Sequence, residues 1–230
     1  VTGWAVGYSG TILKTSNGGQ SWQNQTSGTT NYLTAIHFAD AQIGWAVGDS
    51  GTILKTTNGG QSWQNQNIGN EIMLRGVRFI NALTGWATGF YGTFLKTTNG
   101  GLSWQSLNIG TQEFYSSVYF LDSQNGWAVG YRGKIMTTSD GGENWLIVGS
   151  GTAAHLNDVH FPTQGQGWAV GDLGAILTFV DNRPIYPLTP SSIRNGKIFQ
   201  KMATDCNPSN VPVLSTLVKA LPGPHFGISG

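Results

Sequence analysis

Residues 44–63 read GWAVGDSGTILKTTNGGQSW, and the rest of the chain is organised around copies of this stretch. The pentapeptide GWAVG, or a near copy of it, starts at Gly3, Gly44, Gly85, Gly126 and Gly167, so successive copies are 41 residues apart. A constant period without insertions implies that each unit packs on the next in one fixed geometry.

Each unit contains four short segments with strand character, separated by turn residues. The first segment, 33–38, has apolar residues two apart, and it recurs at 74–79, 115–120 and 156–161. The second is the GWAVG run, the third starts near residues 11, 52, 93 and 134, and the fourth starts at the Trp of Ser21-Trp22. Four strands in about 40 residues are typical of a propeller blade.

The predicted fold is therefore all-β: a β-propeller of four-stranded blades with about five blade repeats of 41 residues. A parallel β-helix also repeats, but its coils usually have only about 20 to 30 residues. A seven-stranded sandwich would not repeat one sequence, because its strands occupy unequal positions.

The composition limits the classes of function. Of the 230 residues 39% are hydrophobic and 10% charged, and the net charge is +1, so we expect no binding to nucleic acid. No apolar run approaches the length of about 18 residues that spans a membrane. The single Cys206 excludes an internal disulfide and a multi-cysteine zinc site. Low charge with many small polar residues leads us to expect an extracytoplasmic location, in the periplasm, on the cell surface or secreted.

The turn between the third and fourth strands carries a second motif, TSNGGQSW at 15–22, and its copies keep an Asn or Asp, glycines and a Trp. The acid or amide accepts backbone N–H bonds, glycine tolerates positive φ, and we expect the Trp to pack between sheets. The residues of this motif are Asn17, Asn58, Asn99 and Asp140, with Trp22, Trp63, Trp104 and Trp145.

This motif resembles the Asp-box of bacterial neuraminidase (BNR) repeats. Together with GWAVG-x-x-GTILKT it resembles, more narrowly, the photosystem II stability/assembly factor family, over residues 3 to 186. The resemblance implies a non-enzymatic propeller that binds a membrane-protein subunit outside the cytoplasm. Photosynthetic members are typically longer, with seven blades and an Arg-rich patch, whereas this chain has five units and few arginines, which argues against a photosynthetic role.

The last unit departs from the pattern at 181–186, where both glycines of the motif are missing. We expect propeller repeats over 1–187 and a separate tail or cap over 188–230. A segment near 196–202 falls where the next innermost strand is due, and its pairing beside Trp4 would close a five-bladed ring. The alternative is that the chain is a piece of a longer propeller.

The loops of one face differ among units that are otherwise alike, which makes this face the predicted binding surface. It carries the turns between the second and third strands and the connections from each unit to the next. Aromatic residues and isolated charges converge there. The predicted binding residues are Tyr8, Tyr32, Asp49, Glu71, Arg75, Phe90, Tyr91, Glu113, Tyr131, Arg132, His155 and Asp172.

An Asp-box suggests a sialidase-like glycoside hydrolase, which needs three arginines around a carboxylate. Arg75 and Arg78 lie three apart on one strand and so point to opposite faces, and Arg132 is far away in the sequence. His37 and His160 occupy equivalent positions that Arg78 and Tyr119 fill in other units, so we expect strand histidines without a metal. No catalytic residue, metal or cofactor is predicted.

We therefore expect no enzyme but a binding scaffold that recognises a protein or peptide partner, as an assembly factor or accessory subunit. The alternative is a glycan-binding, lectin-like propeller that stacks sugars on tryptophan. A multivalent lectin would keep equivalent pockets in every unit, whereas these loops differ. A purely architectural role inside a surface assembly is a third possibility.

Overall fold

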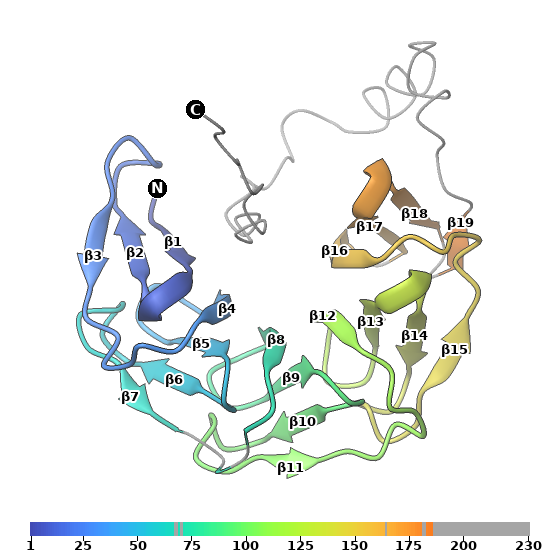
Figure 1. Ribbon diagram of the computed structural model, residues 1–230, viewed down its shortest axis with the longest axis horizontal. Helices are drawn as coiled ribbons and strands as arrows, with labels where there is room; N and C mark the ends of the chain where they lie inside the picture. Colours follow the sequence, from blue (N-terminus) through green and yellow to red (C-terminus); the bar gives the residue numbers. More distant parts are fainter. Residues whose placement is uncertain (67–68, 70, 164, 181–182, 186–230) are drawn as a thin grey trace, which may run out of the picture.

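The computed structural model describes residues 1–66, 69, 71–163, 165–180 and 183–185. They form five antiparallel sheets arranged like blades around a central axis, with β4, β8, β12 and β16 innermost (Figure 1). The fold is thus an all-β propeller, as predicted. The predicted tail 188–230, its candidate strand near 196–202 and Cys206 lie outside the described residues.

The five sheets follow one another along the chain. Sheet one contains β1 (Gly3–Val6), β2 (Ile12–Thr15) and β3 (Gln23–Gln25). Sheet two contains β4 (Leu33–Phe38), β5 (Gly44–Gly48), β6 (Ile53–Thr56) and β7 (Gln64–Asn65). Sheet three contains β8 (Leu74–Phe79), β9 (Gly85–Gly89), β10 (Phe94–Thr97) and β11 (Gln105–Ser106).

Sheet four contains β12 (Tyr115–Phe120), β13 (Gly126–Gly130), β14 (Ile135–Thr138) and β15 (Leu146–Val148). Sheet five contains β16 (Leu156–Thr163), β17 (Gln166–Gly171), β18 (Ile176–Val180) and β19 (Arg183–Ile185). Three single turns of 3-10 helix complete the described elements: η1 (Tyr8–Gly10), η2 (Tyr131–Gly133) and η3 (Asp172–Gly174).

Adjacent sheets are joined by stacked aromatic rings. In sheets one to four the Trp of the GWAVG strand stacks on a Phe of the innermost strand of the next sheet. Trp45 lies 3.4 Å from Phe79 between ring centroids, and Trp86 lies 3.5 Å from Phe120. Both indoles are fully buried, so the GWAVG motif supplies the core between blades.

In sheets two to five the glycine that opens the GWAVG run lies against the same aromatic ring. A Cβ on Gly85 would lie 2.5 Å from the ring of Phe79, which is paired with it across the sheet. Any larger residue would push the Phe off the neighbouring Trp. The absence of a side chain at Gly85 therefore leaves the space that the ring of Phe79 occupies.

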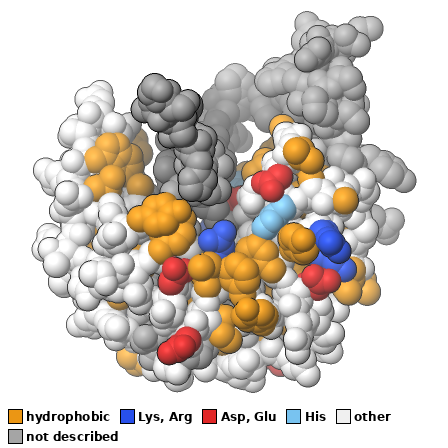
Figure 2. Space-filling model, in the orientation of Figure 1, with side chains coloured by type: hydrophobic (Ala, Val, Ile, Leu, Met, Phe, Trp, Pro, Cys, Tyr) orange, Lys and Arg blue, Asp and Glu red, His pale blue; other side chains and the backbone are white. Residues whose placement is uncertain are grey.

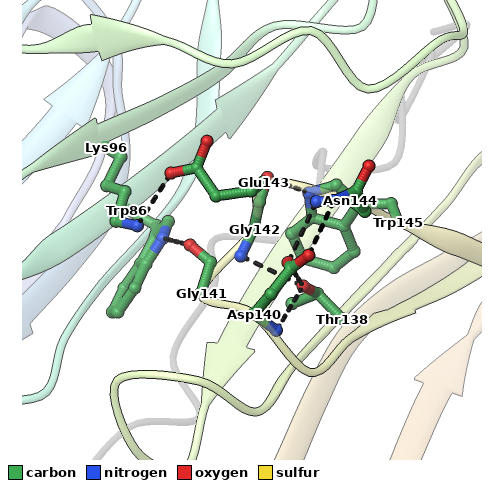
Figure 3. Close-up of polar contacts among 9 residues, drawn as sticks. All are labelled: Trp86, Lys96, Thr138, Asp140, Gly141, Gly142, Glu143, Asn144 and Trp145. Atoms are coloured by element: carbon green, nitrogen blue, oxygen red, sulfur yellow. Dashed lines mark hydrogen bonds and ion pairs between the residues drawn. The ribbon is translucent and has the colours of Figure 1, made fainter.

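The TSNGGQSW-type turn is held by its own side chains and fastened to the preceding sheet (Figure 3). In the sheet-four copy Asp140 accepts N–H bonds from Asn144, and Thr138 Oγ1 accepts one from Gly142 N at 3.0 Å. The indole of Trp86 in sheet three donates to Gly141 O of this turn at 3.0 Å. The hydrogen bonds that the backbone and side-chain N–H groups of Asn144 donate to Asp140 lower the pKa of the Asp140 carboxyl to about 2.

The motif tryptophans differ from the prediction in the start of the fourth strand. The fourth strand begins one residue after the Trp, because the indole still belongs to the turn: Trp145 Nε1 donates to Gly142 O at 3.0 Å. The indoles of Trp63, Trp104 and Trp145 are half-buried and pack between sheets, as expected. Trp145, for example, lies edge-on to Phe120 of its own sheet and 4.9 Å from Phe94 of the preceding sheet between ring centroids. Sheet one has no innermost strand within the described residues, so Trp22 lacks a Phe of its own sheet and is 40% exposed.

Candidate functional site

The face predicted to bind is built on a continuous backbone frame. We call it the upper face: it consists of the turns between second and third strands, including η1, η2 and η3, and the connections between sheets. The connections that precede β4, β8 and β12 are each bonded to the turns on both of their sides, and the connection that precedes β16 is bonded to the turn that follows it. Asn31 O accepts from Gly10 N at 2.9 Å, and Tyr32 O accepts from Asp49 N at 2.9 Å. The same pattern recurs around the propeller, so the frame is independent of the side chains that it presents.

The middle residue of every upper-face turn has a left-handed backbone. Ser9, Ser50, Tyr91, Arg132 and Leu173 have φ between 52° and 57°, and a glycine follows each of them. An L-residue in this region costs roughly 1–2 kcal/mol, and such costs gather at functional positions. The conformation directs the side chain outward: Tyr91 is 74% exposed and Leu173 is 91% exposed.

Aromatic residues meet in pairs across this frame. The first residue of a turn faces the connection residue that follows in the chain, and both positions recur every 41 residues. Tyr8 stacks on Tyr32 at 4.2 Å between ring centroids, and Phe90 stacks on Phe114 at 4.4 Å. His155 lies edge-on to Phe114 at 5.1 Å and to Tyr131 at 6.0 Å. The pairs of sheets three and four are thereby linked through one histidine.

One arginine, Arg75, lies between the Tyr8–Tyr32 pair and the group formed by Phe90, Phe114, His155 and Tyr131. The guanidinium carbon of Arg75 lies 5.6 Å from the ring centroid of Phe114 and 6.0 Å from that of Phe90. Its charge also acts on Asp49 and Tyr32 on the other side. Burial raises the pKa of Asp49 above its usual value, and the Arg75 charge opposes this rise. Arg75 thus lies between a Tyr–Tyr pair and a Phe–Phe–His–Tyr group.

Further charges lie at the rim of this area. Lys134 pairs with Glu113 at 3.6 Å, and the guanidinium of Arg132 lies 5.2 Å from the Tyr131 ring centroid. Figure 2 shows this face, with hydrophobic side chains in a band and isolated charged side chains and a histidine among them. A band of exposed aromatic rings with a polar rim is the usual composition of a recognition surface.

The structure brings most of the predicted binding residues into this band. Tyr91 lies at its edge, with its ring 6.2 Å from that of Phe90. Glu71 is exposed, and Asp172 lies in sheet five, where Asn157 Nδ2 donates to it at 2.8 Å. Phe114 is not among the binding residues predicted from the sequence, although it contacts Phe90, His155 and Arg75 in the middle of the band. The signal was available, because Tyr32, Met73, Phe114 and His155 share one position of the repeat.

The hydrolase arrangement is not assembled. Arg75 lies on the upper face and Arg132 at its rim, while Arg78 faces the central channel between the innermost strands. The searched, described part of the chain holds no group of three His, Cys, Asp or Glu residues suited to a metal ion. It also contains no helix long and apolar enough to cross a membrane.

Comparison with known proteins agrees with this architecture. The family model described as photosynthesis system II assembly factor YCF48 matches residues 1–68 and 26–113. The chain is a BNR-type β-propeller that resembles this assembly factor. A search of curated proteins found no match.

Solved structures show the fold of the BNR propeller. YCF48 from Cyanidioschyzon merolae is 20% identical with a TM-score of 0.64, and the alignment covers 77% of this chain and 65% of that protein. A GH74 enzyme of Niastella koreensis is 14% identical with a TM-score of 0.66, over 82% of this chain and 35% of the enzyme. A YCF48 structure described as bound to D1 peptide is 21% identical with a TM-score of 0.49, over 71% and 69%. The chain therefore spans less than two thirds of the first two proteins.

Proposed function

We propose that this chain is a non-enzymatic binding propeller that recognises an exposed segment of a protein partner through its upper face, outside the cytoplasm. The partly exposed aromatic pairs of this face carry the proposal. They are held on a rigid backbone frame, so little conformational entropy is lost when a partner binds. Aromatic side chains, Tyr and Phe among them, are enriched in protein interfaces.

The chemistry of the face favours one asymmetric partner. Apolar side chains of an extended segment would pack on Tyr8–Tyr32 and Phe90–Phe114, and a carboxylate would pair with Arg75 between them. The pairs differ from sheet to sheet, whereas a multivalent glycan lectin would repeat one pocket. The resemblance to an assembly factor supports the same reading, and we extend it to an assembly or accessory role.

The test uses a peptide library displayed on phage and panned against the full chain. Selected peptides are then measured by calorimetry against the variant Tyr91→Ala/Tyr131→Ala. We expect the affinity to fall roughly tenfold or more, because two exposed aromatic contacts are removed. Melting of the variant checks that the fold is intact.

Leu102→Ala is the matched control. Leu102 lies in the turn between β10 and β11, on the face opposite to the upper face, where Gly100 N of this turn donates to Leu83 O of the turn between β8 and β9. Leu102 is as exposed as Tyr91, at 74%. Its removal leaves peptide affinity unchanged if the upper face binds. Equal losses in both variants would contradict the proposal, and recognition of a glycan array in place of peptides would assign the face to sugars.

A further inference from the structure

The innermost strands line a central channel with one recurring row of side chains. His37, Arg78, Tyr119 and His160 occupy the same position of β4, β8, β12 and β16, and all four line one cavity of about 450 Å³. This cavity is distinct from the upper-face aromatic pairs, because none of their residues lines it. It is large enough to hold a small molecule.

Arg78 is a cation without a counter-ion in the part of the chain that the structure describes. Its Nη1 lies 3.0 Å from His37 Nε2, and its guanidinium carbon lies 4.1 Å from the Tyr119 ring centroid. Its Nε is buried and has no hydrogen-bond partner there. The ion pairs found in this part join Lys96 to Glu143 and Lys134 to Glu113. A charge removed from water without a partner is costly, so the site favours an anion.

The neighbouring imidazoles leave the charge of Arg78 in place. Burial, with a smaller effect of the Arg78 charge, lowers the pKa of His37 to about 3. Burial and Arg78 also lower the pKa of His160, although Asp158 opposes them. Both rings are therefore neutral near pH 7, and His37 Nε2 accepts from the guanidinium.

Two carboxylates, Asp40 and Asp158, line the same cavity, and both are already engaged. Asp40 Oδ1 accepts hydrogen bonds from Gln42 N at 2.7 Å and from Ile43 N at 2.8 Å. Asp158 on β16 accepts a hydrogen bond from Ser117 Oγ at 2.5 Å. Strand β12 separates β16 from the strand that carries Arg78. The cavity thus combines a cation that has no counter-ion among the described residues with two carboxylates that already accept hydrogen bonds.

We propose that the channel binds a small carboxylate on Arg78, with Tyr119 and the two neutral histidines as the surrounding wall. A carboxylate is planar and singly charged, which matches the fork of one guanidinium. A phosphate near pH 7 would bring up to two charges to one cation. The carboxylate can belong to a free small acid or to the side chain of a partner protein, since both present the same group.

The experiment titrates the 15N-labelled full chain with sodium acetate near pH 7 at constant ionic strength. The Nε–H signal of Arg78 and the ring signals of His160 report occupancy of the channel. We expect saturable shifts in the native protein, and binding weaker by roughly tenfold or more in Arg78→Gln. The matched control Arg132→Gln removes a cation of the upper face and leaves acetate binding unchanged.

Two further probes separate the chemistries. Inorganic phosphate is expected to bind more weakly than acetate, and this comparison needs only the native protein, so it holds even if Arg78→Gln does not fold. N-acetylglutamate amide presents the carboxylate on a peptide unit: tighter binding than acetate assigns the site to a protein side chain, and weaker binding to a free acid. Phosphate binding as tight as acetate, or equal acetate affinity in native protein and Arg78→Gln, would overturn the proposal. Peptide binding at the upper face is measured separately and does not depend on Arg78.

Discussion

Arg75 and Arg78 lie three residues apart on β8 and belong to different surfaces. A register shift between Leu74 and Gly76 interrupts the pairing of β8 with β9 just where Arg75 leaves the strand. Arg75 therefore turns to the upper face, while Arg78 keeps the regular alternation and faces the channel. The sequence predicted the separation through alternation, and the bulge explains why Arg75 is found among the loops.

The stability of the chain toward acid depends on His37. Its pKa is about 3 in the fold against 6.5 for the free group, so the unfolded chain binds a proton between these values that the folded chain does not. Stability present above about pH 6.5 is therefore lost as pH falls toward 3, by roughly 1.4 kcal/mol per pH unit at most.

We expect His37→Gln to show a shallower loss of stability than the native protein between about pH 6 and pH 4. Glutamine keeps an acceptor for Arg78 and does not titrate. Urea denaturation at several pH values measures the difference between the two slopes, which removes the contribution of the carboxyl groups common to both. Parallel slopes would mean that the pKa of His37 is the same in the folded and the unfolded chain.

At the scale of the element, the upper-face turn combines strain with exposure. The strained position of the third sheet is Tyr91, with φ of 55°. Glycine adopts this conformation without steric cost but loses more entropy on folding, so Tyr91→Gly is expected to stabilise the chain by roughly 0.5–1 kcal/mol. The same change removes an exposed ring and should weaken peptide binding.

Ser50→Gly is the companion variant, because Ser50 has the same backbone at φ of 53° and carries no aromatic ring. It is expected to gain similar stability without loss of affinity. Guanidinium denaturation and calorimetry together measure both quantities. Destabilisation of both variants would show that the turns are not strained.

At the scale of the whole molecule, neighbouring sheets are joined through the turn of the next unit. Trp86 Nε1 donates to Gly141 O in sheet four, whereas the equivalent Nε1 of Trp127 is buried and has no partner among the described residues. Both indoles stack on a Phe of the following sheet.

Trp86→Phe is therefore expected to destabilise the chain by about 1 kcal/mol more than Trp127→Phe. Both changes remove the same atoms from a buried stack, so the difference isolates the hydrogen bond to the Gly141 carbonyl. Chemical denaturation of the two variants gives the comparison. An equal loss would indicate that ring stacking alone joins the sheets.

The repeat made the architecture predictable, while the details of the site were less so. Period and alternation located the innermost strand Leu33–Phe38 and the run Gly44–Gly48 at their observed bounds. The exposure of Trp22 could not be predicted from the repeat, because it depends on a Phe of an innermost strand that sheet one lacks within the described residues. The stacking of Phe90 on Phe114 depends on hydrogen bonds between a turn and the following connection. The spacing of residues along the sequence does not predict these bonds.

The alternating turns and connections of the upper face are tied by main-chain bonds, so their geometry tolerates exchange of the side chains above them. Positions such as Tyr8, Phe90 and Tyr131 are then open to drift or to randomisation without loss of the scaffold. A library varied at the first two residues of every such turn should stay folded and yield members with new specificities, which makes the architecture a template for engineered recognition.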